Sequence, residues 1–212
     1  PATLELTLAA LFVAILVAFP LGALSARRPN SAIDVGAGAF ALIGVSLPNF
    51  WLGPLLIIAF SIHLGLTPVS GRGSFAHLIL PAITLGTALA GILARLVRAG
   101  LLDVLNKPFI QAARARGIGE QRITFTHALK NSLLPVITVL GLQFGALLAG
   151  AIITETIFSW PGVGLLLITA INARDYPLVQ GCVLIISISY VIVNLIADLS
   201  YGLADPRIRF KR

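Results

Sequence analysis

Few side chains in this sequence are placed for catalysis. The segment "SGRGS" at residues 70–74 and the nearby His77 offer hydroxyls and an imidazole, the groups used by serine hydrolases. A nucleophile and its base must be held together inside the protein, whereas these residues lie in a polar loop between apolar runs. The sequence contains no G-x-x-x-x-G-K-[ST] phosphate-binding loop. We therefore expect no enzyme activity and no ATP hydrolysis from this chain.

Residues for metal binding or thiol chemistry are equally scarce in this sequence. The single cysteine, Cys182, lies in an apolar run, so neither a disulfide framework nor a cysteine metal cluster is expected. His63, His77 and His127 fall in or beside different loops, and these loops lie on opposite sides of the membrane in the five-span arrangement predicted below. We expect no metal site and no cofactor bound by this chain.

The composition points to a membrane protein. Of the 212 residues, 58% are hydrophobic and 11% are charged, whereas about a quarter of the residues in a soluble domain are charged. No Asp, Glu, Lys or Arg occurs in residues 6–26, 35–71, 73–94, 131–154 or 176–197. Each run can cross a hydrocarbon core, which takes about 20 apolar residues. The sequence predicts an all-α polytopic membrane helical bundle, with five spans over residues 4–26, 33–64, 79–98, 132–155 and 178–203.

Prolines and small residues refine this prediction. We expect a kink or break in the second span at Pro48 and Pro54, because proline removes a backbone donor. The third span is expected to start at Pro81. Residues 156–173 are charge-free, but "SWPGVG" makes them a poor span. Small residues four apart in the fourth span indicate a packing seam, within the subunit or with a partner: Gly141, Gly145 and Ala149.

The basic residues set the expected orientation. Along a five-span path, all of the 15 Lys and Arg residues except Arg72 and Arg174 fall on one side. Positive charge marks the cytoplasmic side, so the C-terminus is predicted to be cytoplasmic. Outside the loops no basic–aromatic surface suggests nucleic-acid binding. The chain has no Met and opens at Pro1 directly before a span, so we expect a segment of a longer protein.

A polar stretch at about residues 103–131 interrupts the apolar sequence on the predicted cytoplasmic side. Pro108 indicates a helix start, and Gly117 supplies a positive φ at which a second helix can turn away. The adjacent Ala112 and Ala113 would let another surface come close to the backbone. A docking element and an amphipathic loop held by lipid headgroups both fit this pattern.

The sequence "QAARARG" at residues 111–117, followed by a Leu–Pro that enters a span, resembles the "EAA…G…LP" loop of permease subunits in ATP-binding-cassette importers. The resemblance extends over nearly the whole chain. The segments "GVSLPNFWLG", "LTPVSGRG", "TETIFSWPGVG", "ARDYPLVQG" and "LADPRIRF" are similar to the dipeptide/oligopeptide (and nickel) permease family, specifically its first, B-type permease subunit. Members of that family have six spans, so the resemblance implies that the N-terminal span is missing here.

The resemblance implies a single permease domain over residues 1–212 and a set of coupling-loop residues that sit in a cleft of an ATPase subunit: Gln111, Ala112, Ala113, Arg116, Gly117 and Glu120. Two departures stand out. Gln111 replaces the usual Glu, which removes an ionic contact, and the proline comes late, at Pro135, as in peptide-type permeases. The implied location is the cytoplasmic membrane of a prokaryote.

The family also implies partners and cargo. The expected partners are a second homologous permease subunit, two ATPase subunits that hold ATP and Mg, and an extracytoplasmic solute-binding protein. Candidates for an outer gate or binding-protein contact are Trp160, Pro161, Arg174 and Asp175. Polar candidates for the pathway are Gln143, Thr154 and Glu155. Peptides are the expected cargo. Nickel, glutathione or another small solute, and a gradient-driven secondary transporter, are the alternatives.

Overall fold

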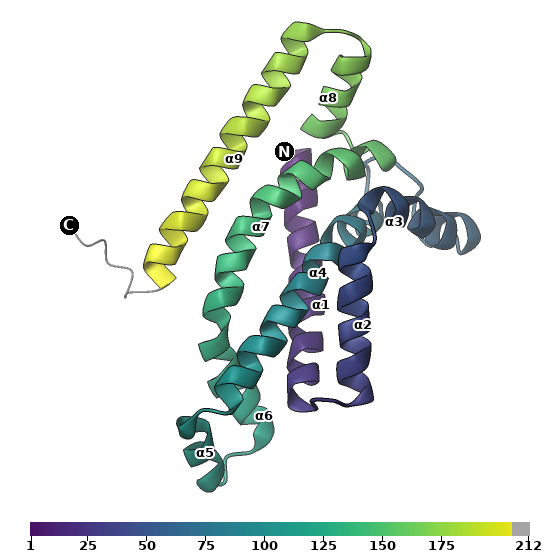
Figure 1. The fold of residues 1–212 in the computed structure, drawn as a ribbon. Helices are drawn as coiled ribbons and strands as arrows, with labels where there is room; N and C mark the ends of the chain where they lie inside the picture. Colours follow the sequence, from purple (N-terminus) through teal and green to yellow (C-terminus); the bar gives the residue numbers. More distant parts are fainter. Residues whose placement is uncertain (205–212) are drawn as a thin grey trace, which may run out of the picture.

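The computed structural model describes the backbone of residues 1–204, and the side chains within that range except those of residues 133, 134, 149, 197, 198 and 200–204. Helices joined by short loops make up this part of the chain, and it contains no strand. The helices are, in order, α1 (Ala2–Arg27), α2 (Ala32–Ser46), α3 (Asn49–Leu56), the π-helical η1 (Ile57–His63), α4 (Phe75–Leu105), α5 (Pro108–Ala115), α6 (Glu120–Arg122), the π-helical η2 (Ile123–Ala128), α7 (Leu129–Ile157), α8 (Val163–Asn172) and α9 (Tyr176–Ala204). Figure 1 shows their arrangement.

The membrane-spanning elements agree in number with the expected five spans when bent pairs are counted as one. Three helices are long and apolar enough to cross a membrane, namely α1, α4 and the described part of α9. Two bent pairs bring the count to five: α2 with Asn49–His63, at 108°, and Glu120–Ser132 with Pro135–Leu148, at 56°. Residues 163–172 form only the short apolar helix α8, which confirms that the "SWPGVG" region does not span.

The prolines act differently from one another. The chain turns at Pro48, which is the N-cap of α3, so the break expected there is confirmed. At Pro54 no break occurs, because the helix continues through Pro54 and becomes π-helical at Ile57; a kink at this proline stays a prediction. Pro81 does not start α4, because that helix begins at Phe75. The main-chain N–H of Ser74 donates to Nδ1 of His77 at 3.1 Å, and this cap fixes the helix start one and a half turns earlier.

The core of the bundle is the close crossing of α1 and α4. Every fourth residue along the first part of α1 is buried, namely Ala2, Leu6, Ala10, Ala14 and Ala18. A Cβ built on Gly86 of α4 would lie 2.6 Å from the carbonyl oxygen of Ala10, so only glycine fits this contact. Small residues let two membrane helices approach in this way, with dispersion forces between backbones replacing the hydrophobic effect.

The remaining long helices pack around this pair. Gly91 of α4 meets Ala41 of α2 at a comparable distance, with its built Cβ 2.6 Å from the Ala41 carbonyl oxygen. On the other side, the ring of Tyr190 in α9 covers Gly145 of α7. At Gly145 the predicted seam is a contact within the subunit, while the side chain of Ala149 lies outside the described residues. The outer faces of α9 carry exposed Leu, Ile and Val side chains, as a lipid-facing helix requires.

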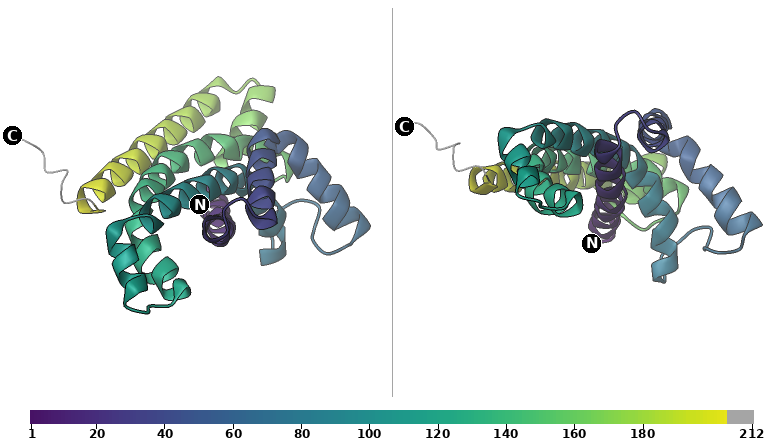
Figure 2. Two further views of the ribbon diagram at one scale, coloured as in Figure 1. Left: turned by 60° about the horizontal axis from the view of Figure 1, so that its bottom comes forward. Right: turned by 90° about the horizontal axis from the view of Figure 1, so that it is seen from below.

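The two ends of the bundle differ in character. At one end, α5 and α6 project beyond the long helices, on the side where α1 turns into α2 (Figures 1 and 2). At the opposite end lie the N-terminus, α8 and the turn into α9 (Figure 1). The basic residues of the α1–α2 turn and of α5 belong to the first end, since Arg27 and Arg114 line the same pocket. Arg72 belongs to the second end, where it meets Glu5 near the start of α1.

Candidate functional site: an exposed helical loop and an outer cluster

The projecting loop is a helix–turn–helix, as the sequence predicted. Pro108 is the first residue of α5, where its missing N–H costs nothing. The helix ends before Gly117, whose φ of 77° is the left-handed conformation expected there. No atom lies within 4 Å of a Cβ built on Gly117. The glycine is therefore required by backbone geometry and not by crowding.

An ion pair closes the turn. Nε of Arg114 donates to Oε1 of Glu120 at 2.7 Å, and its second nitrogen donates to Oε2 at 3.3 Å. The hydrogen bond from Arg114 lowers the pKa of the Glu120 carboxyl and raises the pKa of the guanidinium. The contribution to loop stability is therefore present above the ordinary carboxyl pKa and is lost as the pH falls through the lowered one. Both side chains are about half exposed, so the contribution is small.

The loop exposes small and polar side chains together with two aromatic ones, Phe109 and Phe125, and it is anchored from beneath. Gln111, Ala112 and Arg116 are exposed, and Ala113 is half-buried. The anchors are apolar or small residues that are fully buried on the inner side, namely Ile110, Ile123, Thr124 and Ala128. All six residues named for this loop therefore lie on one helix–turn–helix, and Glu120 is engaged by Arg114 within it. The result is a protrusion that is anchored by buried side chains and exposed on its outer side.

A charge network ties the α1–α2 turn to α4 near the same end. Asp34 accepts two hydrogen bonds from Arg98, at 2.6 and 2.7 Å. It also accepts from the hydroxyl of Ser25 and from the main-chain N–H of Asn30. A paired carboxylate with all these donors is satisfied although its side chain is almost buried. Because α4 leads directly into α5, this network fixes the base from which the loop projects.

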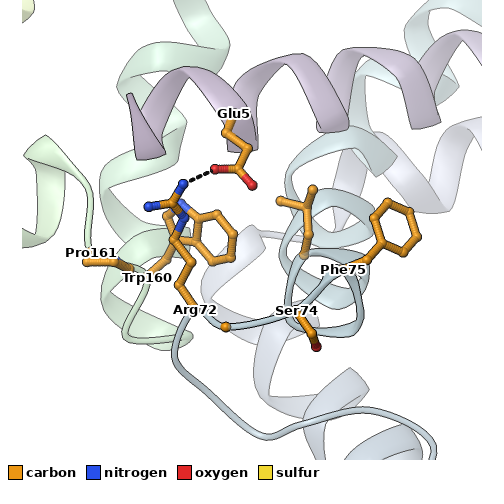
Figure 3. Close-up of a pocket in the computed structure, with 8 residues that line it drawn as sticks. Glu5, Arg72, Ser74, Phe75, Trp160 and Pro161 are labelled. Carbon is orange, nitrogen blue, oxygen red and sulfur yellow. Dashed lines mark hydrogen bonds and ion pairs between the residues drawn. The ribbon is translucent and has the colours of Figure 1, made fainter.

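At the opposite end, Trp160 forms the floor of a cluster that joins three distant segments. The buried indole donates from Nε1 to the carbonyl oxygen of Ala2 at 2.9 Å. The guanidinium of Arg72 lies 5.7 Å from the ring centroid and pairs with Glu5 at 2.5 Å. Figure 3 shows Glu5 on α1 facing Arg72, with Trp160 and Pro161 beside them. These residues, with Gly73, Ser74, Phe75 and Leu78, line a pocket of about 600 Å³, within the usual range for ligand pockets.

The other outer candidates lie apart from this pocket. Pro161 is exposed on its rim, whereas Arg174 and Asp175 are not among its lining residues. Both are exposed in the turn between α8 and α9, where Arg174 has a φ of 57°. A carboxylate oxygen of Asp175 accepts from the main-chain N–H of Leu178 at 3.1 Å. Asp175 therefore caps the start of α9.

The three polar pathway candidates have different surroundings. Gln143 is half-buried in α7. Thr154 and Glu155 are fully buried within the subunit, so in this conformation neither side chain reaches a surface where a second subunit could meet it. The hydroxyl of Thr154 donates to the carbonyl oxygen of Gly150 at 3.4 Å, while Oε2 of Glu155 accepts from the main-chain N–H of Leu165 at 3.0 Å.

Sequence reasoning missed both ion pairs at the ends of the bundle. Glu5 pairs with Arg72, 67 positions away, and Asp34 pairs with Arg98, 64 positions away. A usable signal was present, because Glu5, Asp34 and Arg72 border long charge-free runs and Arg98 lies at the end of the third predicted span. Charges at the ends of spans on the same predicted side are natural partners. Among the side chains that the structure describes, no group of three metal-ligating residues comes together.

Comparison with known proteins decides the family. The profile described as "Binding-protein-dependent transport system inner membrane component" matches residues 18–210. The chain belongs to this family. It is therefore a permease subunit and an inner-membrane component, and the resemblance stated from the sequence is confirmed.

Similar curated proteins agree with one another. The di/tripeptide transport system permease protein DppB of Pseudomonas aeruginosa (strain UCBPP-PA14) is 46% identical over 240 residues, covering 100% of this chain and 71% of the relative. The oligopeptide transport system permease protein AppB of Bacillus subtilis (strain 168) is 42% identical, covering 99% and 70%. The glutathione transport system permease protein GsiC of Escherichia coli (strain K12) is 41% identical, covering 99% and 68%.

Solved structures confirm the fold. An inward-facing structure of the MetNI methionine ABC transporter superposes with a TM-score of 0.79 at 18% identity, covering 96% of this chain and 93% of that one. An amino acid ABC transporter crystallised with histidines gives a TM-score of 0.68 at 19% identity, covering 97% and 90%. The predicted all-α importer membrane fold is confirmed.

Proposed function

We propose that this chain is the B-type permease subunit of an ATP-driven importer of di- and oligopeptides. Separate ATPase subunits bind ATP and Mg, close on the nucleotide and move the loop at residues 103–131. The permease domain spans residues 1–212, and its C-terminus faces the cytoplasm together with the loop. A second homologous permease subunit completes the pathway, and an extracytoplasmic solute-binding protein delivers the peptide.

The observation that carries this proposal is the shape of the projecting loop. It is exposed on its outer side, it is anchored by fully buried Ile110 and Ile123, and it is closed by the Arg114–Glu120 pair. A protrusion that only lay on lipid would need a continuous apolar face outward, whereas here the exposed Phe109 and Phe125 are accompanied by exposed Gln111, Ala112 and Arg116. Small exposed residues on a rigid base suit insertion into a cleft of another protein.

The outer end is proposed to receive the solute-binding protein or to form the outer gate. The pocket lined by Trp160, Pro161, Glu5 and Arg72 supports contact with the solute-binding protein, because it offers a positive and a negative charge beside an aromatic ring. Arg174 and Asp175 form a second exposed point at the same end. Gln143 remains the pathway candidate with some exposure. For cargo, the names of the relatives favour peptides, with glutathione and nickel as alternatives.

A matched pair of substitutions tests the coupling loop. Threonine at position 117 must adopt a φ of 77°, which costs a β-branched residue about 1–3 kcal/mol. Threonine at Gly119, which is the N-cap of α6 with a φ of −64°, is as acceptable there as glycine. Open space surrounds both positions.

The test measures ATP-dependent dipeptide uptake by the complete transporter in proteoliposomes, together with pull-down of the ATPase subunits. We expect Gly117→Thr to lower uptake and ATPase binding several-fold, while Gly119→Thr matches the wild type. Equal uptake by the two variants, with both inserted in the membrane, would show that the geometry of this turn does not carry coupling.

A further inference from the structure

The fully buried carboxylate of Glu155 is the least expected group in the outer half of the bundle. It stands two residues before the end of α7, and one of its oxygens, Oε1, has no hydrogen-bond partner. An uncompensated buried carboxylate is costly, so its retention needs a reason. Its surroundings supply one, because the carboxylate lies against the start of α8.

The carboxylate fills the space that a side chain at position 162 would occupy. A Cβ built on Gly162 would lie 2.0 Å from Oε1 and 2.4 Å from Oε2 of Glu155. Gly162 itself has φ −102° and ψ −178°, a conformation open to any residue. Position 162 is therefore glycine because the Glu155 carboxylate takes the room of a Cβ, and not because of its backbone.

The same carboxylate caps α8. Oε2 accepts from the N–H of Leu165 at 3.0 Å, one of the first N–H groups of the helix, which have no partner within it. The N–H of Val163 donates to Oγ1 of Thr3 at 2.9 Å. The positive end of the α8 dipole favours the negative charge placed there. Glu155 thus acts as an N-cap supplied from another helix.

The main chain of Glu155 also holds the turn between α7 and α8. Its carbonyl oxygen accepts from the N–H of Trp160 at 2.8 Å, and the Trp160 indole reaches Ala2. The carbonyl oxygen of Phe158 accepts from the N–H of Gly71 at 2.8 Å. One residue therefore positions α8 with its side chain and the pocket floor with its backbone.

We infer that Glu155 is the positioning residue of the outer face: its carboxylate, accommodated by Gly162, fixes α8 and holds residues 158–162 in the arrangement that the solute-binding protein meets. The second half of this statement rests on the proposed function. Glu155 acts through the turn and does not touch the peptide.

A double-substitution cycle tests the packing half without reference to transport. Gly162→Ala is expected to lower the midpoint of thermal unfolding of the purified complex in the wild-type background. In a Glu155→Ala background the same change should be neutral, because the new methyl group enters the space left by the carboxylate.

Gly164→Ala provides the matched control. A Cβ built on Gly164 lies 2.6 Å from Cα of Ile152 as well as 2.9 Å from Oε2 of Glu155, so it should destabilise in both backgrounds. If Gly162→Ala lowers the midpoint equally with and without Glu155, the packing assignment is wrong.

The rate of ATP hydrolysis tests the functional half. With peptide-loaded binding protein titrated against the complex in lipid nanodiscs, Glu155→Ala and Gly162→Ala should each raise the apparent KM of ATP hydrolysis for binding protein about ten-fold, which corresponds to about 1.4 kcal/mol. Vmax should change less than two-fold, whereas simple loss of folded complex would lower Vmax alone.

Glu155→Gln keeps an oxygen for the Leu165 N–H and should restore a KM close to that of the wild type. An unchanged KM in Glu155→Ala, or a KM in Glu155→Gln as high as in Glu155→Ala, would overturn the positioning role. If peptide-loaded binding protein did not stimulate ATP hydrolysis by the wild-type complex, the proposed function would be contradicted. The thermal cycle would still decide the packing assignment.

Discussion

Replacing Gly86 by alanine should force α4 away from α1. The added Cβ would lie 2.6 Å from the carbonyl oxygen of Ala10 and 3.3 Å from its carbonyl carbon. Both are main-chain atoms of a 26-residue helix, so no side chain can rotate to relieve the contact. Overpacking of this kind costs about 1–3 kcal/mol. Alanine regains about 1 kcal/mol of helix propensity, which leaves a net loss of up to roughly 2 kcal/mol.

Gly38 in α2 provides the control, because no atom lies within 4 Å of a Cβ built there. Gly38→Ala should keep the helix-propensity gain and leave the thermal midpoint equal or slightly higher. For a chain of this size 1 kcal/mol corresponds to roughly 2–4 °C, so Gly86→Ala should lower the midpoint of the purified subunit by up to roughly 8 °C and place it below that of Gly38→Ala. A midpoint for Gly86→Ala equal to or above that of Gly38→Ala would refute the close crossing of α1 and α4.

Three further predictions concern the ends of the bundle. Arg98→Asp should sharply lower the thermal midpoint, and the double variant Asp34→Arg/Arg98→Asp should recover part of the loss, since the pair is bidentate. Arg95→Asp, at an exposed position, is the control. No recovery in the double variant would contradict the pairing. Asp175→Ala should cost about 0.5–2 kcal/mol because it removes the cap of α9, while Asp175→Asn keeps an acceptor; equal midpoints would exclude a capping role. Trp160→Phe loses the N–H donated to Ala2 and half of a fully buried ring system. Thermal unfolding should therefore show a loss of about 1 kcal/mol from the hydrogen bond and a further loss from the cavity, and an unchanged midpoint would contradict this packing.

Much of the fold could be predicted from the sequence because the bilayer imposes it. Charge-free runs located all the spans, since a charge in hydrocarbon is expensive. The turn after α5 followed from Gly117, whose positive φ is the conformation that glycine adopts without penalty. These features are local, so one stretch of sequence contains the information.

What could not be predicted depends on helix caps and on how neighbouring helices fold against one another. Pro81 looked like a helix start until the Ser74–His77 cap placed the start at Phe75. Pro54 looked like a break, although the helix runs through it. Glu155 looked like a polar group facing a pathway, and its carboxylate instead lies against Gly162. The helix start depends on the hydrogen bond between Ser74 and His77, and the position of the Glu155 carboxylate depends on how α8 packs against α7. The folded chain shows both contacts.

The proposed function is tested most directly by the energy source of uptake. The complete complex would be reconstituted in proteoliposomes, and entry of a labelled dipeptide would be measured with ATP, with a non-hydrolysable ATP analogue, and with a proton gradient alone. We predict uptake only with hydrolysable ATP, the ATPase subunits and the loaded binding protein together. Uptake driven by the gradient in liposomes that lack the ATPase subunits would contradict the importer account and favour a secondary transporter.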